Sequence, residues 1–201
     1  MAAQVVLLRG VNVGGHRTFR PARLAEQLQH LGAINIGAAG TFVIRNPVTQ
    51  AQLRAELAER LPFDTDIMIC PSREIARLLS QDWFAGRPSR PDIVRFVSVL
   101  SRVPRLSPRL PMTLPSRSDQ PPLSELRQSA GALAKAEGTG PTARGQWLLR
   151  VLARDGRFVI GEYRRQMKAI GCLATLDRVF GSPATTRNWN TITAIARALD
   201  R

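Results

Sequence analysis

The 201-residue sequence has few of the residues that carry most enzyme chemistry. It contains 2 histidines and 2 cysteines, and neither His16 and His30 nor Cys70 and Cys172 have a spacing that suits zinc. We therefore expect no metal and no bound cofactor. No nucleophile has a base beside it, and Glu162, a candidate acid or base, is more simply interpreted as the partner of an arginine in a surface ion pair. These gaps make an enzyme the less favoured class, although a pocket that the sequence does not show stays an alternative.

Long apolar runs and aromatic residues are also scarce. No stretch of roughly eighteen apolar residues occurs, so we expect no membrane span. Aromatic residues make up 5% of the chain, which predicts a mostly aliphatic core. The two isolated cysteines are expected to be buried as small apolar residues. Their rarity is typical of a protein from a reducing cytoplasm.

Arginine is the residue that the sequence has in excess. Lys and Arg total 29 against 15 acidic residues, a formal net charge of +14, and only Lys135 and Lys168 are lysines. Such a skew, beside abundant Ala, Gly and Pro, is what a GC-rich coding sequence would produce without selection for a ligand. The arginines are spread along the chain, so we predict weak, non-specific and salt-dependent attraction to nucleic acid. RNA-type recognition stays an alternative.

An apolar segment near the N-terminus ends abruptly in a glycine-rich loop. Glycine lets a ligand approach the main chain, and exposed amides beside an arginine can hold an anion. The spacing matches neither a P-loop nor a dinucleotide fingerprint. The alternative is a demanding turn that Asn12 braces through side-chain hydrogen bonds. The candidate ligand-binding residues here are Arg9, Gly10, Asn12, Gly14 and Gly15.

A second unusual segment, 185–191, precedes the last expected helix. Asn190 or Thr191 suits the cap of that helix, and Trp189 is expected to anchor its start by packing. Arg187, Asn188 and Asn190 make a candidate donor cluster for a carboxylate or phosphate. The alternative is an ion pair and capping network that fixes the helix in place.

The order of apolar patterns in the first half is typical of a ferredoxin-like unit. Pro21 suits the start of one helix, and Thr49 with Gln52 makes a capping-box pattern for a second. With expected strands at 4–8, 34–36, 41–45 and 66–71, the order is βαββαβ. In the second half we expect a strand at 93–100, a hairpin at 146–162 around Asp155 and Gly156, and helices at about 170–180 and 191–199. Between them, a Pro/Arg-rich loop at about 101–122 shows no periodicity.

Both unusual segments resemble motifs of one bacterial family. Residues 7–15 resemble the opening motif of domain of unknown function 1697, and residues 184–191 resemble its closing motif. The resemblance implies an α+β fold of two ferredoxin-like subdomains, with antiparallel sheets and helices on one face. We expect subdomains at 1–82 and 83–201. The family implies no activity.

Two segments depart from the family pattern. The turn at 39–41, often Ser-Gly-Asn in relatives, is Ala-Gly-Thr here. Relatives usually carry a Gly-Arg-Ser-Lys cluster where this chain has the segment 167–170, and Arg164 and Arg165 lie near enough to substitute with a shifted register. We therefore expect part of any shared family site to be lost or altered here.

These observations favour a cytoplasmic small-ligand or anion-binding module that uses the loop at 9–15 and the motif at 187–190. We expect the two ends to meet, with Arg187 or Asn188 within hydrogen-bonding reach of the loop, directly or through one water. The sequence specifies no oligomeric state.

Overall fold

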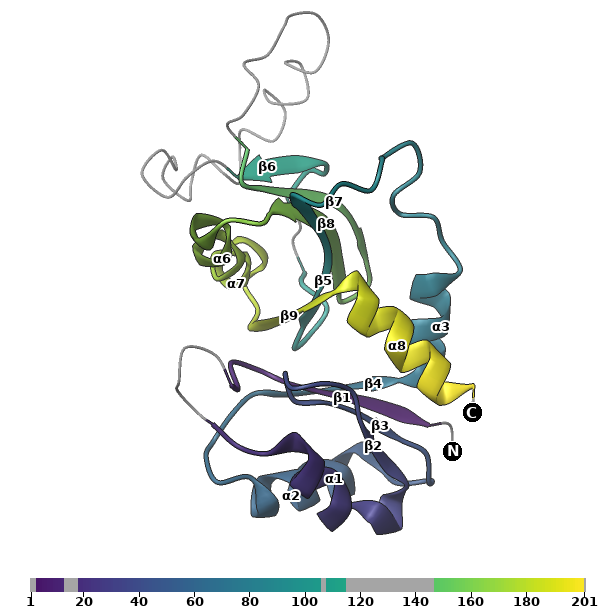
Figure 1. Ribbon diagram of the computed structural model, residues 1–201. Helices are drawn as coiled ribbons and strands as arrows, with labels where there is room; N and C mark the ends of the chain where they lie inside the picture. Colours follow the sequence, from purple (N-terminus) through teal and green to yellow (C-terminus); the bar gives the residue numbers. More distant parts are fainter. Residues whose placement is uncertain (1–2, 13–17, 106–107, 115–146, 201) are drawn as a thin grey trace, which may run out of the picture. The chain divides into compact units, whose positions relative to one another are not determined.

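The computed structural model describes residues 3–12, 18–105, 108–114 and 147–200 (Figure 1). The chain forms two compact units, and we call Met1–Gln81 with Asn190–Arg201 unit 1 and Asp82–Trp189 unit 2. The C-terminal residues therefore group with the first unit. Compactness alone does not establish independent folding, so the division into subdomains at residues 82 and 83 stays a prediction.

Unit 1 contains a four-stranded antiparallel sheet in the order β2-β3-β1-β4. Along the chain its elements are β1 (Gln4–Leu8), α1 (Pro21–Gln27), the 3-10 helix η1 (Gln29–Leu31), β2 (Ala33–Asn35), β3 (Thr41–Ile44), α2 (Gln50–Arg60) and β4 (Ile67–Pro71). This is the predicted βαββαβ arrangement, which is confirmed.

Local sequence signals explain the helices of unit 1. Pro21 occupies the start of α1, where its missing N–H costs nothing, and Gly32 ends η1 in the left-handed conformation with φ of 61°. The Thr49 hydroxyl accepts a hydrogen bond from the Gln52 amide while the Gln52 side chain accepts one from Thr49, so the predicted capping box is confirmed.

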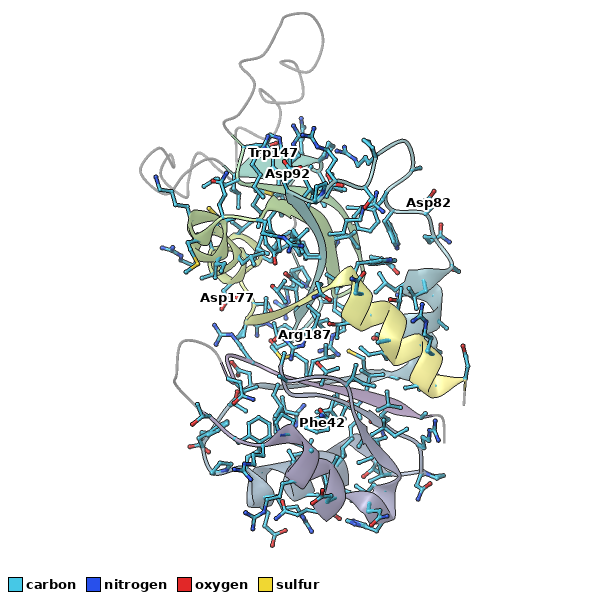
Figure 2. The ribbon with its side chains drawn as sticks, viewed as in Figure 1. Phe42, Asp82, Asp92, Trp147, Asp177 and Arg187 are labelled. Carbon is cyan, nitrogen blue, oxygen red and sulfur yellow. The ribbon has the colours of Figure 1, made fainter. Side chains whose placement is uncertain are left out.

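Both faces of the first sheet carry buried side chains. The face toward α1 and α2 holds an aliphatic core around the fully buried Phe42 (Figure 2). Two further helices of this unit are α3 (Ser72–Leu79) and α8, whose span Trp189–Leu199 begins at the last residue of unit 2. Arg45 Nη2 donates to the Ala198 carbonyl oxygen at 2.7 Å, which ties the end of α8 to the segment after β3.

Unit 2 contains a five-stranded antiparallel sheet in the order β6-β7-β8-β5-β9. Its elements are β5 (Ile93–Leu100), β6 (Met112–Leu114), β7 (Leu149–Asp155), β8 (Phe158–Arg164), α6 (Met167–Leu173), α7 (Leu176–Phe180) and β9 (Ala184–Asn188). Without β6, the order repeats that of the first sheet. Buried residues of α6 and α7 join a core with Phe96 and Val159, and Figure 1 shows these helices on one face.

Two strands of unit 2 differ from the sequence prediction. The prediction of no folded element within 101–122 is wrong at β6, where Met112 and Leu114 are buried against β7; residues 106–107 and 115–122 lie outside the described part. Residues 185–188, expected to lead into the last helix, belong to β9, and this strand pairs with β5. Both are short edge strands whose partners lie far away in sequence, so no local period reveals them.

No helix among the described residues is long and apolar enough to cross a membrane. Cys70 and Cys172 form no disulfide and are fully buried, which confirms that they pack as small apolar residues.

Candidate functional site

A row of charged side chains crosses three neighbouring strands of unit 2. Arg95 on β5 pairs in register with Glu162 on β8, and Glu162 pairs with Arg150 on β7. Since residues directly opposite one another in antiparallel strands project to the same face, the three side chains share one face of the sheet. The neighbouring pair Phe96 and Gly161 alternates to the other face, which packs against α6 and α7. The charged row is therefore on the face away from those helices.

Glu162 is the buried centre of this row, with 3% of its surface exposed. Its Oε2 lies 3.5 Å from Arg87 Nη1, and its Oε1 lies 3.9 Å from Arg95 Nε. The predicted ion pair with an arginine is confirmed, but it is buried rather than on the surface. A buried carboxylate requires such partners, because taking an unpaired charge out of water is costly.

Arg95 is held in place from several sides. Its Nη2 donates to the Arg87 carbonyl oxygen at 2.6 Å, and its guanidinium carbon lies 4.6 Å from the centre of the Phe84 ring. Phe84 in turn meets Trp189 edge-to-face at 5.2 Å, which fits the predicted role of Trp189 as a packing anchor. The aromatic pair thus supports the guanidinium that faces Glu162.

Trp147 supports two further arginines at the same end of the sheet. The guanidinium carbons of Arg150 and Arg164 lie 4.2 Å and 4.9 Å from the centre of its ring. Asp92, which Figure 2 shows at the same end as Trp147, accepts from Arg164 Nη1 at 3.1 Å and from Arg90 Nε at 3.1 Å. Within the described part of the chain, the buried Arg164 Nε has no hydrogen-bond partner.

Glu162, Trp147 and several of these arginines line a pocket of about 520 Å³. Its size falls in the range of small-molecule sites. The lining combines cationic, aromatic and apolar groups: Ala85, Gly86, Arg87, Pro88, Arg90, Ile93, Trp147, Arg150, Glu162 and Arg164. Positive charge exceeds negative charge in this set, so the pocket is suited to an anion.

Sequence reasoning missed this pocket because its arginines lie far apart along the chain. Arg87 and Arg90 precede β5, whereas Arg150 and Arg164 belong to the hairpin of β7 and β8, and only the strand register brings them together. The available signal is the hairpin itself, where charged residues alternate with apolar ones. Of the two residues offered above as substitutes for the missing family cluster, Arg164 lines the pocket and Arg165 does not.

The described part of the N-terminal loop is braced by its own hydrogen bonds. Asn12, with φ of 54°, donates from Nδ2 to the Ala38 carbonyl oxygen at 2.8 Å and accepts from the Phe19 amide at 2.9 Å. Arg9 Nη1 lies 3.0 Å from Asp66 Oδ2. Gly10 has φ of 61°, a conformation that favours glycine. Gly14, Gly15 and His16 lie outside the described residues.

Asn12→Ala should lower the free energy of unfolding by about 2 kcal/mol, because it removes two side-chain hydrogen bonds and strains a left-handed backbone. Asn12→Gly loses the same hydrogen bonds without the strain, so its loss should be about 1 kcal/mol smaller. Chemical denaturation of both variants measures the two contributions. Equal stability of wild type and Asn12→Ala would show that the side chain does not brace the turn.

The C-terminal motif is divided between the two units. Arg187, on β9 of unit 2, is buried and donates from Nη1 to Thr185 Oγ1 at 2.8 Å and to the Thr186 carbonyl oxygen at 2.9 Å. Desolvation lowers the pKa of the Arg187 guanidinium to about 10, so it stays protonated at neutral pH. Asn188 and Asn190 are exposed.

Helix α8 begins at Trp189. Asn190 and Thr191 therefore lie inside its first turn, and the prediction that one of them caps the helix is wrong. The predicted contact of Arg187 or Asn188 with the N-terminal loop joins two different units and stays a prediction. Among the described residues, no group of three or more His, Cys, Asp or Glu side chains could hold a metal ion.

The fold and pocket define an α+β protein built from two antiparallel sheets of related strand order, with an arginine-rich pocket on the second. The chain belongs to the family described as Protein of unknown function (DUF1697), whose model matches residues 1–109. The resemblance inferred from the opening motif is thereby confirmed. The matched region includes Arg87 and Arg90 of the pocket but ends before its hairpin residues and before the closing motif.

A solved structure with a similar fold is that of the conserved bacterial protein SP0830 from Streptococcus pneumoniae. It is 15% identical, the match covers 98% of each chain, and the TM-score is 0.54. At this identity the likeness shows the fold alone. No curated protein matches the chain.

Proposed function

We propose that the protein is a binding module for a small organic anion, and that the arginine pocket of unit 2 holds the ligand. The observation that carries this proposal is the convergence of Arg87, Arg90, Arg150 and Arg164 on one cavity of about 520 Å³. Arginine presents several N–H donors in a fixed planar fork that matches carboxylate and phosphate oxygens. Such a cluster has no need of a metal to attract an anion.

The charge balance supports the same conclusion. Four arginines line the pocket, and Arg95 lies 3.9 Å from Glu162. The carboxylates that pair with these arginines are those of Glu162 and Asp92. The surplus of positive charge sits partly out of water, where electrostatic attraction is stronger than at an exposed surface.

Binding at the N-terminal loop and the C-terminal motif is a separate proposal. Gly10 and Asn12 both have positive φ, a backbone form found in anion-binding turns. The proposed ligand contacts there are those of Arg9, Gly10, Asn12, Gly14, Gly15, Arg187, Asn188 and Asn190. Two buried cysteines that form no disulfide are compatible with the reducing cytoplasm that we infer for the protein.

For nucleic acid, the described strands of unit 1 offer little support. Phe42, the one aromatic residue in those strands, is fully buried and therefore is no platform for stacking bases. A diffuse attraction driven by the net charge of +14 stays the expected behaviour toward polyanions.

Arg164→Gln tests the proposed pocket. We expect the affinity for a bound small anion to fall about 10-fold or more, because a charge-assisted hydrogen bond contributes about 1.5–3 kcal/mol. The measurement is isothermal titration with phosphate, sulfate, citrate and aromatic anions at constant ionic strength. Tryptophan fluorescence gives a second readout through Trp147.

Arg178→Gln is the matched control, because it removes the same charge from an exposed position on α7, away from the pocket lining. It should bind as the wild type does. An equal loss in both variants would attribute binding to net charge, and no binding of any anion to the wild type would refute the proposal.

A further inference from the structure

We infer that the ligand of the arginine pocket is a phosphate monoester of a small apolar or planar group, bound as the dianion. This inference rests on the proposed function and names its ligand class. It depends on three features of the pocket: the directions from which the arginines approach, the position of Glu162, and the apolar part of the lining.

The arginines approach the cavity from three separate segments. Arg87 and Arg90 come from the chain before β5, Arg150 from β7 and Arg164 from β8. A phosphate monoester presents three terminal oxygens in tetrahedral directions, so it can accept from guanidinium groups on several sides. A carboxylate presents two oxygens in one plane and can satisfy fewer of them.

Asp92 and Trp147 keep two of these arginines in place. Arg164 is bound to Asp92 at 3.1 Å and lies against the Trp147 ring, and Arg150 lies against the same ring. Guanidinium groups fixed in this way lose less conformational freedom when a ligand binds. Trp147 is thus a positioning residue for Arg150 and Arg164.

Glu162 contributes the negative charge with which Arg87 and Arg95 pair at the pocket. Its ion pairs with Arg87 and Arg95, at 3.5 Å and 3.9 Å, are longer than an ordinary charge-assisted hydrogen bond, which is about 2.7–2.9 Å. Arg87 is also partly exposed, with 36% of its side chain accessible, so it can turn toward a second anion. Glu162 repels an anion, but the four arginines of the lining outnumber this one carboxylate, so the net attraction is about twice as large for a doubly charged group as for a singly charged one.

The apolar part of the lining indicates an ester rather than a free ion. Ala85, Pro88 and Ile93 line the cavity together with the arginines, and the volume of about 520 Å³ exceeds what an inorganic ion needs. An organic group attached to the phosphate would remove this apolar surface from water. The pocket therefore matches a ligand with one dianionic end and one apolar end.

Three probes test this inference on the full chain. Phenyl phosphate has both ends, benzoate keeps the ring with a single charge, and inorganic phosphate lacks the ring. At pH 7.5 and constant ionic strength, we expect phenyl phosphate to bind about 10-fold more tightly than either of the others. Its affinity should fall several-fold as the pH drops from 7.5 to 5, because a phosphate monoester gains its second charge near a pKa of about 6.

Glu162→Gln tests the role of the buried carboxylate. Removal of its charge should tighten phenyl phosphate binding about 3-fold or more and leave the pH dependence in place. Arg90→Gln, at an exposed arginine of the lining, should weaken binding, which keeps the test decisive if Glu162→Gln fails to fold.

The outcomes separate the two proposals. Benzoate that binds as tightly as phenyl phosphate, or phenyl phosphate affinity that does not change with pH, would overturn the inference and leave an anion pocket. Absence of binding by all three probes, together with the wider anion panel above, would overturn the proposed function itself. Weaker binding to folded Glu162→Gln would show that the carboxylate contacts the ligand favourably, which also contradicts the inference.

Discussion

Gly161→Ala should lower the free energy of unfolding of unit 2 by about 3 kcal/mol or more. A Cβ at this position would lie 2.1 Å from the Arg150 carbonyl oxygen and 2.7 Å from both Cε1 and Cζ of Phe96. The first contact is with the backbone of a paired strand, which cannot turn away as a flexible side chain could. Phe96 is fully buried in the core, so its ring has no free space to enter.

Gly171→Ala is the matched control for this substitution. A Cβ there would meet no atom within 4 Å, and the residue lies inside α6. Because alanine is favoured over glycine in a helix, this variant should gain up to about 1 kcal/mol. Chemical denaturation followed by tryptophan fluorescence measures both variants, since the chain has three tryptophans, Trp83, Trp147 and Trp189. A loss below about 1 kcal/mol for Gly161→Ala would show that the strands separate easily at this point.

The close approach of the Arg150 backbone to Gly161 also positions the residues of the proposed site. Gly161 pairs with Val151, next to the irregularity between Val151 and Ala153, and Glu162 pairs with Arg150. A Cβ at Gly161 would push the Arg150 backbone away and so shift Arg150 relative to Glu162. Anion binding by any folded fraction of Gly161→Ala should therefore also be weaker than in the wild type.

Local signals made the first half of the chain predictable. The apolar run of β1, the proline that starts α1 and the capping box of α2 each depend on residues close together in sequence. Such features specify an element before any tertiary contact forms. The resemblance at residues 7–15 then pointed to the family and to the ferredoxin-like order that the structure confirms.

The two edge strands of unit 2 could not be found in the same way. Thr185, Thr186 and Arg187 alternate between buried and half-buried positions, but the pattern is too short to separate a strand from the start of a helix. The partner of β9 is β5, more than eighty residues earlier in the chain. Pairing over such a distance depends on the tertiary fold, which a local pattern does not contain.

Local sequence patterns were also a poor guide to the candidate site. Density of glycine made the N-terminal loop conspicuous, yet the described residues there use Asn12 and Arg9 for internal contacts. The even spread of arginines along the sequence argued against a cluster. Strand register nevertheless brings Arg150, Glu162 and Arg95 into one row, so spacing in sequence was a poor guide to spacing in the fold.

Phe42 is the largest fully buried side chain among the described residues of unit 1. Phe42 lies within β3, is fully buried, and belongs to a cluster with Leu24 of α1 and with Leu53 and Leu57 of α2. Its partner on β1 is Val6. The core therefore receives side chains from the sheet and from both α1 and α2 around this ring.

Phe42→Ala should lower the free energy of unfolding of unit 1 by about 3–5 kcal/mol, because it removes a large buried side chain and leaves a cavity that rigid neighbours fill only in part. Phe42→Leu keeps most of the volume and should lose less than about 1.5 kcal/mol. Chemical denaturation followed by far-UV circular dichroism measures the loss in both variants. The same cost for the leucine and alanine variants would show that the shape of the ring, rather than the buried volume, stabilises this core.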